Sequence, residues 1–553
     1  MKYIKKDIIS IILLLLLLLS ANFYTFIFAD AMFEGLADRC WYVLVTGLGY
    51  VVGLSLFRLR TFFIIAGVAQ MIILPIEVSS IYLNGESVSM PFMNWIISTN
   101  SREAYELLSS VWWLVLIVIV VWSLYGWLVT NINDDTKALF YQKWSGFVIT
   151  MVMMVTLLFI NALQLNKNYT APNKRVYVQI FAWAFGMRMG NVFPYDIYLQ
   201  TYRALKHQRE IDGVTSLSNF RFGIMPRNDT DSVLYVLVIG EAARYQNFSL
   251  NGEYERETNP LLSHQPNLVL YTRAYAEANA TDLSVPLMIT RASAEDPIRA
   301  YNEKTIGGAF QEAGYKIAWL SADASPIRYL QHVLPSFDTT WIASSEVLDE
   351  ALLEPFWELI NFHHEFSNNS LIILHTIGSH LNYQDRYPES FAVFEPCLKR
   401  GISQGSFDKT LMTNTYDNSI LYTDYLLKSL IQMISATNRC ACLIYMPDHG
   451  ENLCDDERKL WVHGSFEGSE WEYHVPLLVW YSDKYQEKYP NKVKALIKNK
   501  DKQVTSQVVF YTLCGMADLQ EVVDNRYNLT SDSLLEAETI RVLNGRGEII
   551  EPF

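Results

Sequence analysis

Cysteine is scarce in this sequence, and the few cysteines are irregularly spaced. The 553 residues contain six of them, at Cys40, Cys397, Cys440, Cys442, Cys454 and Cys514. No pair has the Cys-x-x-Cys spacing of a thiolate metal site, and the number is low for a dense disulfide framework. The sequence therefore signals neither a cysteine-built zinc site nor a fold held by disulfides. Cys440 and Cys442 alternate along one apolar run and are expected to be buried.

Positive charge is also lacking. The chain has 44 Lys and Arg against 58 Asp and Glu, which gives a formal net charge of -14. A nucleic-acid-binding protein usually carries a basic patch or stripe. The composition gives no such footprint, and no internal repeat or low-complexity segment stands out.

Hydrophobic residues are abundant, at 50% of the chain, and 14% of the chain is aromatic. Five apolar runs fall in the first 165 residues, at 8–29, 41–57, 61–83, 111–129 and 146–165. About 20 residues cross a bilayer core. The first run is longer than the apolar region of a signal peptide, so it is expected to remain as a helix. The sequence thus predicts a five-span membrane domain followed by one large globular domain.

Basic residues predict the orientation of these spans. Lys2, Lys5 and Lys6 precede the first span, and further Lys and Arg occur in alternate loops. Because such residues mark the cytoplasmic side, the chain after Asn166 is expected outside the membrane. We therefore predict a membrane domain at 1–165, interfacial helices and a linker at 166–225, and a periplasmic domain at 226–553. A helix is predicted from Pro194 to about Gln208. The segment either lies at the membrane interface or is a connector packed on the globular domain.

From residue 232 onward, short apolar runs alternate with helical stretches. This pattern predicts an α/β domain with a mostly parallel sheet and helices on both faces. Three of the runs end at polar residues: 233–239 before Glu241, 371–374 at His375, and 442–446 before Asp448 and His449. Ligand sites in open α/β sheets lie at the carboxyl ends of the strands. These polar residues are therefore candidates for one site.

The chemistry of these residues suits a metal ion. Carboxylate oxygen and imidazole nitrogen are ligands for zinc. Of the ten histidines, five fall in this part of the chain, at His375, His380, His449, His463 and His474. Together with Glu241 and Asp448 they predict a site for one or two metal ions. Taken alone, Asp448-His449 could equally be a surface turn with a capping Asp.

Thr281 is a candidate nucleophile. It is expected at the N-cap of a predicted helix that continues through Ser284, Val285 and Pro286. Threonine is a favoured helix N-cap, so a purely structural role is an alternative. Helix N-termini also favour anions. In addition, a metal ion beside the hydroxyl would promote loss of its proton.

Several motifs, taken together, resemble a known family. They are Gly240-Glu241, Asn247-Phe248-Ser249-Leu250-Asn251-Gly252, Thr258-Asn259-Pro260, Thr281 with Ser284-Val285-Pro286, His375 to His380 with Arg386-Tyr387-Pro388, Asn414-Thr415-Tyr416-Asp417-Asn418, and Asp448-His449-Gly450-Glu451. This combination resembles the membrane phosphoethanolamine transferases of the alkaline phosphatase superfamily, and in particular the lipid A transferases that include the colistin-resistance enzymes. The predicted five-span N-terminus is similar as well.

The resemblance implies an activity and a set of site residues. It implies transfer of phosphoethanolamine from phosphatidylethanolamine to a phosphate of lipid A, in a monomer of the bacterial inner membrane with its catalytic domain in the periplasm. It implies one or two zinc ions. The implied zinc ligands are Glu241, Thr281, Asp448 and His449, with Thr281 also the nucleophile. The implied substrate or second-metal residues are His380, which is also a catalytic proton donor, His463, His474, Thr99, Asn100, Glu103 and Arg328.

The chain departs from the family pattern at cysteine positions. Family members usually carry Cys four residues before and six residues after the nucleophile, where this chain has Glu277 and Leu287. Cys397 keeps one member of another pair, whose partner is absent. Because no implied zinc ligand is lost, the chemistry is expected to survive, while loop rigidity and acceptor choice are open.

Other activities remain alternatives at this point. A glycerol-phosphate transferase of the lipoteichoic acid synthase type shares the five spans and the Thr nucleophile. Lipopolysaccharide core or periplasmic glucan are alternative acceptors. A sulfatase is disfavoured because the segment 284–288 lacks the Arg of the sulfatase cofactor-forming motif. From another class, the outer domain would only bind a lipid, without catalysis.

Overall fold

The structure is a computed structural model that describes residues 2–28, 42–44, 46–47, 49–50, 59–84, 87–98, 112–132, 193–212, 217, 219–226, 232–324, 326–345, 347–400, 408–465 and 467–551. The chain divides into two compact units, Met1–Leu205 and Lys206–Phe553. The division falls within one helix, α10 (Tyr195–Asp212). The three-part division at residues 165 and 225 stays a prediction.

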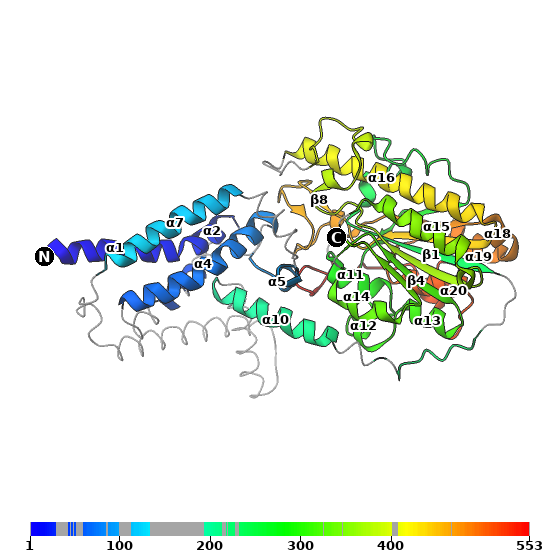
Figure 1. Cartoon of the computed structure of the whole chain (residues 1–553), viewed down its shortest axis with the longest axis horizontal. Helices are drawn as coiled ribbons and strands as arrows, with labels where there is room; N and C mark the ends of the chain where they lie inside the picture. The colour runs from blue at the N-terminus through cyan, green and yellow to red at the C-terminus, as the bar shows by residue number, and fades with distance from the viewer. Residues whose placement is uncertain are drawn as a thin grey trace. The chain divides into compact units, whose positions relative to one another are not determined.

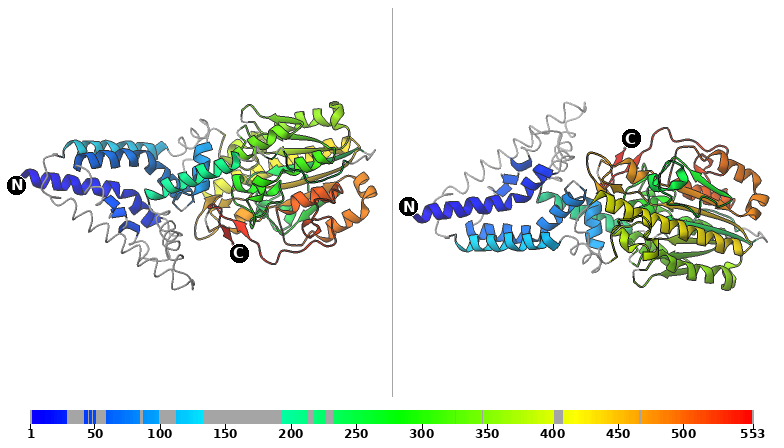
Figure 2. Two further views of the ribbon diagram at one scale, coloured as in Figure 1. Left: turned by 90° about the horizontal axis from the view of Figure 1, so that it is seen from below. Right: turned by 90° about the horizontal axis from the view of Figure 1, so that it is seen from above.

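The described part of the first unit is helical, and most of its helices are apolar. Those described are α1 (Lys2–Leu18), α2 (Ser20–Phe28), α4 (Leu59–Asn84), α5 (Met90–Ser98), α7 (Trp112–Thr130) and the beginning of α10. Helices α1, α4 and α7 lie side by side (Figures 1 and 2) and share a core that includes Leu18, Phe63 and Leu128. Large apolar side chains such as Ile72 and Val120 are exposed on their outer faces. Helices that are apolar on every side suit a lipid environment.

Three of the five predicted spans coincide with described apolar helices. Among the described residues, one helix is long and apolar enough to cross a membrane, over Leu59–Ile81 of α4. Shorter apolar helices cover Ile9–Leu18 and Leu116–Thr130. The run 146–165 and most of 41–57 lie outside the described residues. The five-span organisation therefore stays a prediction.

Helix α10 begins directly after Pro194, as predicted, and continues one turn beyond the expected end. Tyr198, Tyr202 and Leu205 are exposed and spaced three or four residues apart. Residues at this spacing share one face of a helix. The expected interfacial role of this helix remains a prediction.

A seven-stranded sheet forms the centre of the second unit (Figure 1). Its strands are, in spatial order, β2 (Leu268–Tyr271), β10 (Leu477–Tyr481), β7 (Cys440–Pro447), β1 (Val233–Gly240), β6 (Ser370–His375), β4 (Lys316–Ser321) and β5 (Thr339–Ile342). All neighbouring pairs are parallel except the two made by β10. The predicted mostly parallel sheet is confirmed, and the three strands predicted from apolar runs are present and slightly longer.

Both faces of the sheet are covered, which explains why its central strands are continuous apolar runs. Along β1, Leu237 and Ile239 face one core, while Val236 and Val238 face the other. The first core is covered by α11 (Thr281–Met288), α13 (Ile306–Glu312), α14 (Arg328–Val333), α18 (Asp483–Lys488), α19 (Pro490–Lys498) and α20 (Val508–Met516). The second core is covered by α15 (Leu353–Phe362) and α16 (Lys409–Ala436).

Short elements complete the unit. They are the helices α12 (Arg299–Asn302) and α17 (Glu470–Tyr473) and the paired strands β3 (Ala274–Tyr275) with β11 (Val504–Thr505), β8 (Asn452–Leu453) with β9 (Trp461–Val462), and β12 (Val542–Leu543) with β13 (Ile549–Ile550). The five cysteines in the described part of the chain are free thiols, and Cys440 and Cys442 are buried as expected.

Candidate metal centre and nucleophile

The three strands that predicted the site are neighbours in the middle of the sheet. β1 pairs in parallel with β6, which ends at His375, and with β7, where Gly240 lies opposite Pro447. The next residues are Glu241 after β1 and Asp448 after β7, and the Asp448 amide donates to the Gly240 carbonyl at 3.0 Å. Because parallel strands share their carboxyl edge, residues about 200 positions apart meet here.

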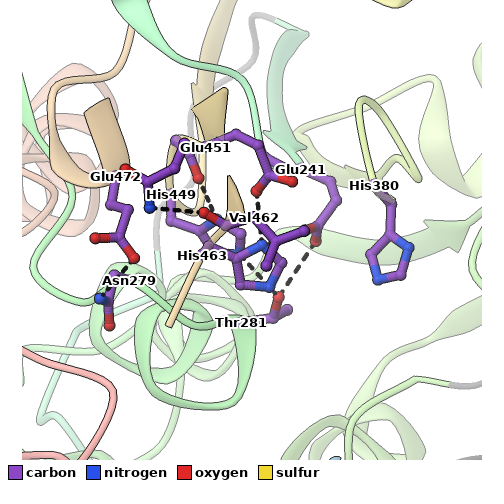
Figure 3. A network of polar contacts seen from close by, with 12 residues as sticks. Glu241, Asn279, Thr281, His380, His449, Glu451, Val462, His463 and Glu472 are labelled. Atoms are coloured by element: carbon purple, nitrogen blue, oxygen red, sulfur yellow. Dashed lines mark hydrogen bonds and ion pairs between the residues drawn. The ribbon is translucent and has the colours of Figure 1, made fainter. Parts of the chain in front are cut away.

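Polar side chains converge at this edge, among them Glu241, Thr281 and His449, which Figure 3 labels. Thr281 Oγ1 lies 3.3 Å from Glu241 Oε2 and 3.3 Å from His449 Nε2. His449 Nε2 lies 3.4 Å from Glu241 Oε1 and 3.5 Å from Asp448 Oδ2. The structure thus brings together all four residues that the resemblance implied as zinc ligands.

The hydrogen bonds of this cluster leave its donor atoms available for a cation. Glu241 Oε1 and Asp448 Oδ2 are buried without a hydrogen-bond partner. The other Asp448 oxygen accepts the amides of His449 and Ala242, at 2.8 and 3.3 Å. His449 Nδ1 faces the Gly450 carbonyl at 2.8 Å, so this nitrogen carries the proton and Nε2 keeps its lone pair. Two carboxylates, an imidazole and a hydroxyl fit a four-coordinate zinc ion.

The electrostatics of the cluster also favour a cation. Burial and the neighbouring Asp448 carboxylate raise the pKa of Glu241 well above its ordinary value. Burial lowers the pKa of His449, which favours the neutral imidazole. A divalent cation would reverse the cost of ionising Glu241, because it attracts the charged carboxylate. A positive charge at the centre of the site would therefore offset the repulsion between the two buried carboxylates.

Thr281 is the first residue of α11 and not its N-cap, which corrects the sequence prediction. Ala280 occupies the N-cap position and offers no capping side chain. The Thr281 hydroxyl is therefore not used to cap the helix and points at Glu241 and His449 (Figure 3). Ser284, one turn later, donates to the Asp448 carbonyl at 2.5 Å and ties α11 to the end of β7.

His463 lies beside His449, with ring centroids 4.0 Å apart. Its Nδ1 donates to Glu451 at 2.7 Å, and Tyr383 donates to the other oxygen of the same carboxylate at 2.6 Å. Burial lowers the pKa of His463, but the charge and hydrogen bond of Glu451, together with the charges of Asp448 and Glu472, raise it, and the net pKa lies above the ordinary value. Glu451 thus orients His463 next to the candidate metal centre.

Glu472, another buried carboxylate, connects the loops around the site. Glu472 is fully buried and accepts hydrogen bonds from Asn279, at 3.0 Å, and from the amide and hydroxyl of Ser465, at 2.9 and 2.5 Å. Asn279 lies two residues before Thr281, and Ser465 lies two residues after His463. Glu472 therefore links the nucleophile segment to the His463 loop.

His380 lies near the cluster, but no interaction drawn in Figure 3 joins it to the other side chains. Its loop is held by Asp349, which accepts the amides of Ile377 and Gly378 at 2.8 and 2.9 Å. Burial and the charge of Arg386 lower the pKa of His380 well below its ordinary value. The imidazole is therefore neutral near pH 7 and must accept a proton before it can donate one.

Replacing Gly378 with Ala is expected to distort the metal centre. Gly378 has a φ of +52°, and an added Cβ would lie 2.7 Å from the Glu241 carbonyl oxygen and 3.0 Å from the Glu241 amide nitrogen. Backbone atoms cannot move aside as a flexible side chain would. Strain of this kind costs about 1–3 kcal/mol. We expect a lower thermal unfolding midpoint and weaker zinc binding in the purified variant.

Gly252→Ala is the matched control, because Gly252 has a φ of +76° and open space around its Cβ position. This variant introduces a Cβ at a positive φ, and thus the same backbone strain, without a steric clash against neighbouring atoms. If both variants bind zinc equally well, Gly378 has no special role at the site.

His474 is not joined to the cluster by any recorded contact. Its ring is stacked between Tyr245 and Tyr275, with centroids 4.2 and 4.8 Å away. Its Nε2 donates to the Thr272 carbonyl at 2.9 Å, and Gln246 contacts Nδ1 at 3.5 Å. Both nitrogens thus have partners outside the cluster, an arrangement that suits packing better than metal binding.

The remaining predicted residues lie elsewhere or outside the described chain. His375 is buried at the end of β6, edge-on to Trp319, and neither of its nitrogens has a hydrogen-bond partner. Arg328 is the exposed first residue of α14. Thr99, Asn100 and Glu103 lie outside the described residues, so their expected lipid-binding role stays a prediction.

Sequence reasoning did not identify three supporting residues, Asp349, Glu451 and Glu472. Glu451 was part of a quoted motif but had no assigned role. For Glu451, the adjacent Asp448-His449 pair was an available signal. Asp349 and Glu472 lie in segments with no motif, so their proximity to the site depends on the fold.

Comparisons with known proteins found similar chains. The chain is 31% identical to phosphoethanolamine transferase EptA of Escherichia coli K12 over 325 residues, which covers 56% of this chain and 57% of that protein. The match thus spans little more than half the length of this curated relative.

Solved structures of similarly named proteins share the fold. The integral membrane protein lipooligosaccharide phosphoethanolamine transferase A from Neisseria meningitidis has a TM-score of 0.73 at 20% identity, covering 94% of this chain and 97% of that one. The C-terminal periplasmic domain of EcEptC from Escherichia coli, in complex with zinc, has a TM-score of 0.52 at 24% identity and covers 60% of this chain and 95% of that one. The model of the family described as Sulfatase matches residues 234–519, more than half of the chain, and the protein therefore belongs to the sulfatase family.

Proposed function

We propose that the protein transfers phosphoethanolamine from phosphatidylethanolamine to a phosphate of lipid A, through a covalent phosphothreonine at Thr281 and with zinc as cofactor. The observation that carries this proposal is the position of the Thr281 hydroxyl, 3.3 Å from both Glu241 and His449. A hydroxyl among candidate metal-ligand atoms at a helix end suits nucleophilic attack on a phosphorus atom, which supports the proposal. The names and similar fold of the curated relatives and solved structures support the same reaction class.

Glu241, Thr281, Asp448 and His449 would hold the zinc ion. When bound, zinc would act as a Lewis acid toward the phosphoryl group and favour the deprotonated Thr281 oxygen. His463 and Glu451 lie next to this centre and would complete a second metal or substrate position. Metal analysis of the purified protein will distinguish one bound zinc ion from two.

In the first step, Thr281 Oγ1 bonds to the phosphorus of phosphatidylethanolamine, and the bond from phosphorus to the diacylglycerol oxygen breaks. The proton of the Thr281 hydroxyl must reach the leaving oxygen. A neutral His380 suits this relay, since it accepts a proton before donating one. In the second step, a phosphate oxygen of lipid A bonds to the same phosphorus and frees Thr281.

The proposed setting is the bacterial inner membrane, with the catalytic domain in the periplasm and several spans in the first 165 residues. Both substrates are membrane lipids, which suits a chain whose first unit carries exposed apolar helix faces. The protein is proposed to work as a monomer.

Mass spectrometry of lipid A from cells with and without the protein tests the function. We expect an added phosphoethanolamine group only in the lipid A of cells that contain it. Addition of glycerol phosphate in place of phosphoethanolamine would support the lipoteichoic acid synthase type of reaction. Phosphoethanolamine on core sugars or periplasmic glucan would instead reassign the acceptor.

Removal of metal is expected to stop the reaction. Treating the purified full-length protein with EDTA should reduce transfer from phosphatidylethanolamine to background, and added zinc should restore it. Without a cation, the unpartnered oxygens of Glu241 and Asp448 both lie beside His449 Nε2 with no charge to balance them. Binding of lipid vesicles, measured in parallel, serves as the control. A protein that only binds lipid would show vesicle binding and no transfer, with or without EDTA.

A further inference from the structure

Helix α16 holds the backbone that follows Glu241. Tyr416 of this helix is fully buried, and its hydroxyl donates to the Ala242 carbonyl at 2.7 Å. The same hydroxyl accepts the Arg244 amide at 2.9 Å. One oxygen atom thus closes the turn Ala242–Arg244 from its α16 side, although Tyr416 makes no recorded contact with the metal-ligand atoms.

The turn that Tyr416 holds is strained. Ala242 has a φ of +52°, in the left-handed region that residues with a Cβ rarely adopt. Such a conformation persists only where surrounding contacts impose it. Because Ala242 directly follows Glu241, its backbone angles set the direction in which the chain continues after Glu241.

Hydrogen bonds also join the same turn to residues of the candidate metal centre. The Ala242 amide donates to Asp448 Oδ1 at 3.3 Å, and the Ser379 amide donates to the Glu241 carbonyl at 2.9 Å. The turn is therefore held by hydrogen bonds both to Tyr416 and to these residues.

The next helix residue, Asp417, anchors the rest of the segment independently. It accepts hydrogen bonds from Asn247 at 2.5 Å, Tyr254 at 2.7 Å and Arg256 at 2.6 Å. The segment 242–256 thus stays attached to α16 even when the Tyr416 hydroxyl is removed. Loss of this hydroxyl should therefore act locally on the Glu241 turn.

We propose that Tyr416 is a positioning residue for the metal centre, and that its hydroxyl holds the strained Ala242 turn which aims Glu241 at the cation. The inference rests on the proposed zinc site and extends it to a residue outside the ligand set. It gives the Asn414–Asn418 motif a physical role, since Tyr416 and Asp417 hold adjoining parts of one segment.

Tyr416→Phe tests this role, because Phe keeps the ring that packs edge-on against Tyr383, with centroids 5.1 Å apart. Loss of a residue that orients a metal ligand typically weakens metal binding 10–100-fold. We expect about this loss of zinc affinity in the full-length protein, measured by competition with a chromophoric chelator. Saturating zinc should restore transfer activity, since no ligand atom is removed.

Tyr235→Phe is the matched control, because Tyr235 is equally buried in the same domain and donates to the Met516 carbonyl at 3.0 Å. It should leave zinc affinity unchanged. An equal loss in both variants, or no loss in Tyr416→Phe, would overturn the positioning role. A wild-type protein without zinc affinity would overturn the zinc site as well, whereas tight wild-type binding with an unaffected Tyr416→Phe variant overturns the positioning role alone.

Ala242→Gly supplies a second, independent measurement. Glycine adopts positive φ without strain, so the double variant Ala242→Gly, Tyr416→Phe should regain part of the lost zinc affinity. Absence of any recovery would show that Tyr416 does not act through this turn.

Discussion

Replacing Thr281 with Ala is expected to abolish phosphoethanolamine transfer, with a loss on the order of 10⁴–10⁶-fold as found when enzymes lose their nucleophile. The Thr281 hydroxyl lies within 3.3 Å of both Glu241 and His449 and does not cap its helix. Its removal therefore takes away the attacking oxygen and leaves α11 in place. The covalent adduct on Thr281, detected by mass spectrometry of the intact protein after incubation with phosphatidylethanolamine, should disappear. Zinc content should remain close to that of the wild type, because three ligand side chains are retained.

Two neighbouring substitutions serve as controls for Thr281. Thr281→Ser keeps a hydroxyl and should keep a measurable adduct. Thr290→Ala removes a buried hydroxyl that donates to the Pro286 carbonyl at 2.7 Å, and it should not affect the adduct. An adduct that persists in Thr281→Ala would reject Thr281 as the nucleophile.

Asp448→Asn is expected to cause the largest loss of zinc binding. The amide can keep the oxygen that accepts the amides of His449 and Ala242. It then presents an NH₂ group, with no lone pair for a cation, where the unpartnered Oδ2 now faces His449 Nε2. The loss should exceed the 10–100-fold typical of residues outside the ligand set. Chelator competition and metal analysis of the purified protein measure it.

Asp424→Asn is the control for this substitution. Asp424 also accepts two backbone amides, those of Leu261 at 2.8 Å and Leu262 at 3.0 Å, but it lies on α16 away from the ligand atoms. It should leave zinc affinity unchanged. Zinc affinity that survives in Asp448→Asn would remove Asp448 from the ligand set.

Much of the fold was predictable because its signals are local. The central strands are buried on both faces, so each is a continuous apolar run that ends abruptly at polar residues, as at Met446 before Asp448. The long apolar helices are likewise recognisable from composition, as over Leu59–Ile81. Knowing only that parallel strands share one edge was enough to expect Glu241, Asp448 and His449 to meet.

Other features of the site had no local signal. His474 stacks on Tyr245 and Tyr275, which precede it by about 200 residues in the chain. From the sequence, the clustering of histidines in this region suggested that His474 is a ligand. Thr281 was expected at the N-cap because Thr favours that position, but the cap is set by backbone angles that the chain adopts at Ala280. The strained Ala242 turn is visible only in the backbone, since alanine itself gives no sign of positive φ.

Patterns of neighbouring residues were enough to predict the class of the sheet and to single out Glu241, Asp448 and His449, because apolar runs and their polar ends are local features. Thr281 entered the set of candidate ligands through the resemblance to a known family. Only the fold brings Tyr416 to the Ala242 turn and Asp349 to the His380 loop. The reason is physical. A hydrogen bond to a distant backbone atom depends on where folding places both partners, and no pattern of adjacent residues records it.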